Sequence, residues 1–246
     1  MNIENFDWGW MDIKQNKTHI HLDGRHEDIG SYHKKCIIDE IFEQKIYERF
    51  FEVEENDVVF DIGASIGPFT YSILDKNPNK VFCVEPSIKE HETLINNVAY
   101  DSNKKLRENV VVLKTGITKE DNQIIDTFMF GNVEREIIGN NFYTILNENN
   151  IEKIDFIKTD CEGGEYEIFT SDKICWIKEN IKKISGEWHL GNKEMKNKFK
   201  IFRDTYLRIF PNHEVYSVDG VNIKWDLWND HFIEYYNEVI IYIDNR

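Results

Sequence analysis

The chain has 246 residues, of which 41% are hydrophobic and 13% aromatic, with 45 acidic against 30 basic side chains. This composition excludes a largely disordered chain, and the net charge of -15 argues against nucleic acid as the main partner, because nucleic-acid binding depends on Lys and Arg. Four widely spaced cysteines without a C-x-x-C pair indicate neither a zinc cluster nor a disulfide framework.

Neither a secretory signal nor a membrane span is visible. The first residues lack a positively charged stretch followed by an apolar run, and no stretch approaches the roughly 18 apolar residues of a membrane helix. We therefore expect a cytoplasmic protein without a membrane partner. Nothing in the sequence indicates an oligomeric state.

Residues 1–50 are expected to form a cap over one end of the fold, packed on a single domain at 51–246. The cap contains an expected helix at 32–51 and an aromatic cluster, namely Phe6, Trp8 and Trp10. It also contains a polar cluster, which we interpret first as an exposed loop and second as a contribution to an acceptor pocket: His19, His21, Asp23, His26 and Asp28.

From residue 57 onward, short apolar runs alternate with amphipathic segments, the pattern of parallel sheets built from βαβ units. Strands are expected at 57–62, 80–85, 110–113, 151–159, 181–187, 213–218 and 238–243, and residues 123–130 also look extended. Helices are expected at 66–77, 88–99, from about 164, and at 195–209, where apolar side chains recur every three or four residues. This order predicts an α/β fold.

The first strand runs into a turn that reads D-I-G-A-S-I-G at 61–67. Glycines at such a turn allow a ligand to approach the backbone closely, and the next helix offers free N–H groups. Eighteen residues after Gly67, Glu85 ends the second strand, where an acid can accept hydrogen bonds from both hydroxyls of a ribose. We therefore expect a nucleotide-like ligand at this edge of the sheet.

The spacing of the glycines separates three candidate ligands. A nicotinamide cofactor requires G-x-G-x-x-G, but Ser65 stands where the second glycine belongs. A P-loop requires a lysine after its last glycine, and Pro68 and Phe69 follow Gly67 instead. S-adenosylmethionine remains, and its cationic sulfonium and amino groups suit an acidic site, with Asp61 placed to meet the amino group.

The sequence resembles the FkbM-type methyltransferases, class I enzymes that depend on S-adenosylmethionine. The resemblance rests on the turn at 61–67, V-E-P at 84–86, I-K-T-D-C-E-G-G-E at 157–165 and G-E-W-H at 186–189. Ser65 and Gly164 depart from the asparagine and alanine that are common in the family. The resemblance implies a three-layer Rossmann-like fold with a mostly parallel seven-stranded sheet, its last strand antiparallel, and O-methylation of a hydroxyl, often on a sugar or another small metabolite.

The residues expected to bind the cofactor are those of the turn and of the second strand end, together with Asp160: Asp61, Gly63, Ala64, Ser65, Gly67, Glu85 and Pro86. Asp160 ends its strand where the methyl group should project. Methyl transfer needs an aligned acceptor oxygen, and a base within hydrogen-bond reach helps the hydroxyl to react. We expect His189 to be this base, with Asp160 or Glu162 orienting it or binding the acceptor. Glu165 is interpreted as a helix cap.

Asp160, Glu162, Glu187 and His189 could together hold a divalent cation, but their spacing does not require one, so metal dependence stays open. Two other classes of function are compatible with the same cofactor signals or the same fold. One is a module that binds S-adenosylmethionine without catalysis, and the other is a nicotinamide oxidoreductase, which the missing G-x-G-x-x-G pattern disfavours. Among partners we expect a small hydroxyl compound and no nucleic acid.

Overall fold

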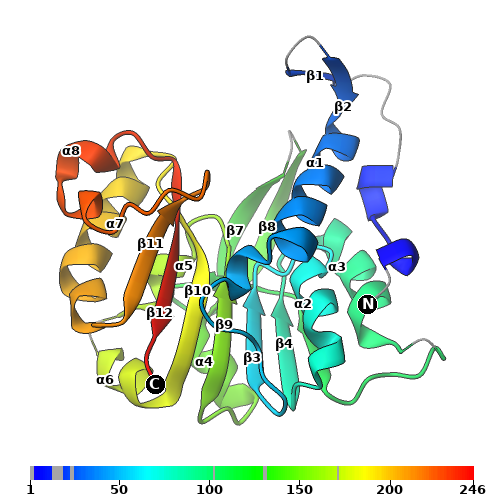
Figure 1. Ribbon diagram of the computed structural model, residues 1–246. Helices are drawn as coiled ribbons and strands as arrows, with labels where there is room; N and C mark the ends of the chain where they lie inside the picture. Colours follow the sequence, from blue (N-terminus) through cyan, green and yellow to red (C-terminus); the bar gives the residue numbers. More distant parts are fainter. Residues whose placement is uncertain (1–2, 13–18, 23–24, 102, 130–131, 171) are drawn as a thin grey trace.

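The computed structural model describes residues 3–12, 19–22, 25–101, 103–129, 132–170 and 172–246. A seven-stranded sheet forms its centre, in the order β11-β12-β10-β9-β3-β4-β5 (Figure 1). The strands are β3 (Val58–Ile62), β4 (Lys80–Val84), β5 (Val110–Leu113), β9 (Ile154–Thr159), β10 (Ile181–His189), β11 (His213–Ser217) and β12 (Glu238–Asp244). Only β12, the last strand of the chain, runs antiparallel to its neighbours in this sheet, which confirms the expected fold.

Helices cover both faces of this sheet. Successive residues of its central strands point to opposite faces, and because both sets are apolar, each face must be buried against helices. Phe60 and Ile157 face a core formed with α4 (Phe142–Glu148), α5 (Glu165–Ile168), α6 (Ile174–Asn180) and α7 (Lys193–Thr205). Val59 and Phe156 face a second core formed with α2 (Pro68–Ile73) and α3 (Ile88–Leu94). The continuous apolar runs of the sequence are therefore strands that are buried on both faces.

The N-terminal segment lies over the second core and the carboxyl ends of the central strands (Figure 1). It contains α1 (Ile29–Ile37), a π-helix η3 (Ile38–Glu43) and a short turn η4 (Ile46–Glu48). The prediction of one helix over 32–51 was wrong at its end, because Lys45 adopts a left-handed φ of 50° and breaks it. Phe6 and Trp8 are buried with Met11 against Ile66 of the glycine turn.

Several elements were not predicted. The hairpin β1 (His19–Leu22) and β2 (Arg25–Asp28) precedes α1, but the side chains of the polar cluster at His19, His21, Asp23, His26 and Asp28 lie outside the described residues, as does that of Trp10. A separate three-stranded sheet follows β5, with β6 (Gly116–Thr118), β7 (Gln123–Met129) and β8 (Asn132–Asn141), of which only β7 was expected, as the extended segment at 123–130.

The expected helix at 195–209 divides into α7 and a short turn η7 (Leu207–Ile209). After β11, two further short elements precede β12, namely η8 (Asp226–Trp228) and α8 (Asp230–Ile233). Within the described part of the chain, none of the helices has the length and apolar character needed to cross a bilayer.

Candidate active site

A cavity of about 1040 Å³ opens at the carboxyl ends of β3, β4 and β9. Its lining brings together the glycine turn, the end of β4, the loop after β9 and side chains of α1 and η3 such as Tyr32 and Glu40. Ligand pockets usually measure about 300–1,000 Å³. The cavity therefore has room for a nucleoside-sized cofactor and a second small molecule.

Gly63 is required for the shape of the cavity at the carboxyl ends of these strands. Its φ is 72°, a conformation that side-chain-bearing residues rarely adopt, and its N–H donates to the Val84 carbonyl at 2.9 Å. A Cβ atom built at this position would lie 1.7 Å from the backbone oxygen of Asp160. The turn and the loop after β9 can approach each other only because position 63 has no side chain.

Gly67 has a different role from the predicted one. It is not among the residues that line the cavity, and a Cβ atom there would lie 2.8 Å from the side chains of Leu94 and Val98. Gly67 thus allows the start of α2 to pack against the segment of α3 and η6 (Ile95–Ala99). The structure supports helix packing at this glycine and not contact with a cofactor.

Glu85 lines the cavity with both carboxylate oxygens held by the backbone. Ser65 N–H donates to Oε2 at 2.8 Å and Ser87 N–H donates to Oε1 at 2.7 Å. Burial, and secondarily the charge of Glu90, raises the pKa of Glu85 to about 8. Because a carboxylate oxygen accepts more than one hydrogen bond, both oxygens can still accept from a ligand. Pro86 and Ala64 also line the cavity.

Asp61 does not reach the cavity, contrary to the prediction. Its side chain is fully buried, its Oδ2 accepts a hydrogen bond from Thr70 Oγ1 at 2.7 Å, and its Oδ1 lies 3.3 Å from Lys158 Nζ. The carboxylate therefore neutralises a buried lysine below the turn, and in this arrangement it cannot meet the amino group of a bound cofactor.

Lys158, near the carboxyl end of β9, has a role in the site that the sequence did not reveal. Its side chain is almost fully buried, and its Nζ donates to the Gly63 carbonyl at 2.6 Å and lies 3.8 Å from Asp160 Oδ2. It thus connects the glycine turn to Asp160. A single lysine in the apolar strand at 154–159 was the available signal, since a buried charge needs a partner.

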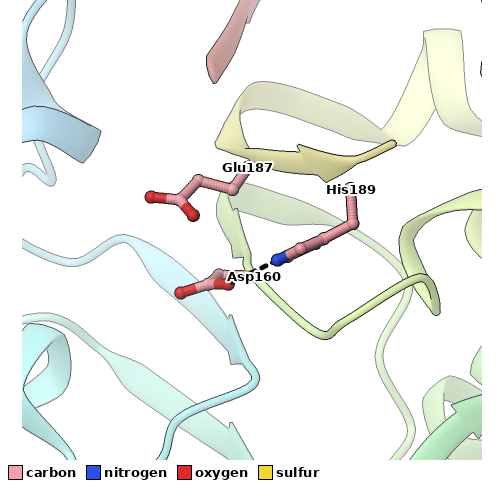
Figure 2. Close-up of side chains that lie close together, drawn as sticks. All are labelled: Asp160, Glu187 and His189. Carbon is pink, nitrogen blue, oxygen red and sulfur yellow. Dashed lines mark ion pairs between the residues drawn. The ribbon is translucent and has the colours of Figure 1, made fainter. Parts of the chain in front are cut away.

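Asp160, Glu187 and His189 converge at the ends of β9 and β10 (Figure 2). The Nε2 atom of His189 lies 3.8 Å from Asp160 Oδ1 and 3.6 Å from Glu162 Oε2. Tyr47 of η4, which the sequence analysis did not single out, can donate its hydroxyl hydrogen to Asp160 Oδ2 at 3.0 Å or to Glu187 Oε1 at 3.3 Å. The N-terminal segment therefore contributes directly to this end.

Glu165, and not Asp160 or Glu162, orients the imidazole of His189. The fully buried carboxylate of Glu165 lies 2.6 Å from His189 Nδ1 and also accepts the N–H of Cys161 at 3.1 Å. It is the first residue of α5, so the predicted position at a helix start was right, but its carboxylate binds the histidine as well.

The charges around His189 oppose its predicted role as the base near neutral pH. Burial lowers the pKa of His189, but the hydrogen bond and charge of Glu165, together with the charges of Asp160 and Glu162, outweigh burial and raise it to about 10. These charges therefore favour the protonated ring near pH 7, the form in which both ring nitrogens donate hydrogen bonds.

Glu162 is the remaining predicted catalytic residue, and it lines the cavity while its side chain stays 81% exposed. Its φ of 55° places a non-glycine residue in the left-handed region, a conformation that often marks functional sites. Its carboxylate can exchange protons both with the cavity and with solvent.

A family model described as the methyltransferase FkbM domain matches residues 61–216, more than half of the chain. The chain belongs to the FkbM methyltransferase family. The match begins at Asp61 and includes every residue of the site described above except those of the N-terminal segment, such as Tyr47. Comparison with the curated proteins finds no match.

Two solved structures are similar to this FkbM family member. The FkbM methyltransferase of Methylobacillus flagellatus KT has 16% identity and a TM-score of 0.51, over 87% of this chain and 52% of that one. This chain therefore spans about half the length of that protein. A putative methyltransferase from Streptococcus mutans, solved in complex with S-adenosylhomocysteine (SAH), has 10% identity and a TM-score of 0.46, over 82% of this chain and 96% of that one.

Proposed function

We propose that this FkbM family member transfers the methyl group of S-adenosylmethionine to a hydroxyl of a sugar or another small metabolite. The observation that carries the proposal is one cavity that joins two sets of polar groups. At one end Glu85 presents two carboxylate oxygens anchored by backbone N–H groups, and at the other Asp160 and Glu187 line the cavity. His189 is not among the lining residues, but one of its ring nitrogens lies within 4.8 Å of both carboxylates.

The residues present fit the cofactor. Glu85 would hold the two ribose hydroxyls, and the turn at 63–65, which lines the cavity, would lie close to the cofactor. The carboxylates that line the cavity would favour a cationic ligand. When bound, S-adenosylmethionine supplies the methyl group, whose carbon–sulfur bond breaks as the acceptor oxygen takes up the carbon.

The chain's own residues position the acceptor and remove its proton. Tyr47 and Lys158 fix Asp160, and Glu165 fixes His189, so an acceptor oxygen between Asp160 and His189 would be held on two sides. Glu162 would take the hydroxyl proton and pass it to water, because its carboxylate reaches both the cavity and solvent. The residues of α1 and η3 that line the cavity would exclude water from the reacting atoms.

The affinity for adenosine should depend on the ionisation of Glu85. Adenosine carries the ribose but no group that titrates near neutral pH. The ionised carboxylate accepts from both hydroxyls, so binding strengthens as the pH rises toward the pKa of about 8. We expect the Kd for adenosine to fall about tenfold between pH 7 and pH 9 if only the ionised form binds. Calorimetry measures this, and Glu85→Gln should abolish the pH dependence. A flat profile for the unaltered protein would exclude this role of Glu85.

Transfer of a tritiated methyl group from S-adenosylmethionine to a panel of sugars and hydroxylated metabolites tests the proposed reaction. On the acceptor that reacts, Glu162→Gln should lower kcat by about 10²–10⁴-fold, the usual contribution of a general base, without changing the Kd for SAH. Glu179→Gln, at an exposed position of α6, is the matched control and should retain full turnover. Binding of SAH without transfer to any acceptor would instead favour a binding module without catalysis.

A further inference from the structure

We propose that Asp160, Glu187 and His189 bind a divalent cation. Each offers one ligand atom, and these atoms all lie within 4.8 Å of one another (Figure 2). Adjacent ligands of an octahedral ion at metal–ligand distances of about 2.1 Å are about 3.0 Å apart, and opposite ligands about 4.2 Å. Small rotations of the three side chains would therefore bring all of them onto one ion.

The environment of His189 points independently to a ligand at Nε2. The residue is 8% exposed, and its Nε2 makes no hydrogen bond to any described residue, the nearest carboxylate oxygens being 3.6 and 3.8 Å away. Its other nitrogen, Nδ1, contacts the carboxylate of Glu165 at 2.6 Å. A histidine that binds a metal almost always donates its second ring N–H to such a partner, which fixes the ring and directs Nε2 at the ion. Binding the ion displaces the proton from Nε2, because only an unprotonated nitrogen can coordinate a metal.

The balance of charge favours a cation at the same place. Glu40 and Glu238 line the same cavity, and Glu238 lies opposite His189 in the register of β10 and β12. Lys158 approaches Asp160 only to 3.8 Å, and it donates to the Gly63 carbonyl and pairs with Asp61. A divalent ion would offset the excess of carboxylates that these residues leave.

Two carboxylates and one imidazole suit Mn²⁺ or Mg²⁺, hard ions that are usually six-coordinate and keep positions for water or substrate. Three protein ligands leave three such positions. The role of the ion in the reaction rests on the proposed function. The ion would hold the acceptor hydroxyl as a Lewis acid and make its proton easier to transfer to Glu162.

Titration of the full chain with Mn²⁺ alone, followed by the electron paramagnetic resonance signal of the free ion, tests the site without any turnover. We expect one saturable Mn²⁺ per chain. Glu187→Gln and His189→Gln should each weaken binding at least tenfold, and Glu165→Gln should weaken it by about 10–100-fold, as loss of a partner behind a ligand does. Glu179→Gln should leave the affinity unchanged.

Adenosine binding, measured on the same samples, shows whether each variant has folded, since Glu85 lies outside the proposed metal site. The proposal would be overturned if the unaltered protein had no saturable Mn²⁺ site. It would also be overturned if Glu187→Gln and His189→Gln both left the Mn²⁺ affinity unchanged. Because adenosine binding does not depend on the ion, a failed metal titration with normal adenosine binding would remove the cation and leave the proposed methyl transfer standing.

Discussion

Gly63→Ala should abolish adenosine binding and lower the free energy of unfolding by about 3 kcal/mol or more. The methyl group would lie 1.7 Å from the backbone oxygen of Asp160, and the φ of 72° is unfavourable for alanine. Since a backbone atom cannot rotate away, either the turn or the loop after β9 must move. Urea denaturation measures the loss of stability, and calorimetry measures adenosine binding.

Gly191→Ala is the matched control for this substitution. Gly191 lies just beyond β10, and a Cβ atom at this position would meet nothing within 4 Å. We expect stability and adenosine affinity close to those of the unaltered protein. If Gly63→Ala behaved like Gly191→Ala, the close approach of the turn to Asp160 would not be required for the site.

Lys158→Met should lower the free energy of unfolding by about 3–5 kcal/mol, the usual cost of removing one partner of a buried ion pair. The substitution leaves the buried carboxylate of Asp61 without its cation and the Gly63 carbonyl without its donor. It also frees the turn, so we expect weaker binding of SAH at a temperature where the variant is folded. Urea denaturation and calorimetry measure the two effects.

Lys183→Met provides a comparison with the same chemistry at the other end of the sheet. Lys183 is equally buried and pairs with Asp57 at 2.8 Å, just before the start of β3. We expect a similar loss of stability with unchanged affinity of the folded protein for SAH. Equal effects of the two substitutions on SAH binding would show that Lys158 acts only through general stability.

The strands of the sheet could be located from the sequence, because most of them are short apolar runs between amphipathic segments. Their arrangement in one seven-stranded sheet was implied by the family resemblance. The position of Glu85 directly after β4 was predictable as well, since it follows from the apolar strand and the spacing after Gly67. The break at Lys45 was not, because the sequence contains no glycine or proline there and only the φ of 50° shows it.

The contacts within the site were much less predictable than its location. Tyr47 meets Asp160 across 113 residues, so no local pattern could reveal the pair. Asp61 has the expected position in the chain, but the burial of Lys158 beside it decides where its carboxylate points. The position of Glu165 at the start of a helix already explained its carboxylate, so nothing in the sequence indicated its hydrogen bond to His189.

Calorimetric titration of the unaltered protein with SAH, with NAD as the comparison, tests most directly whether the cavity binds S-adenosylmethionine. SAH lacks the transferable methyl group, so binding is measured without turnover. We expect saturable binding of one SAH per chain and no measurable binding of NAD. Saturable binding of NAD with no response to SAH would contradict it.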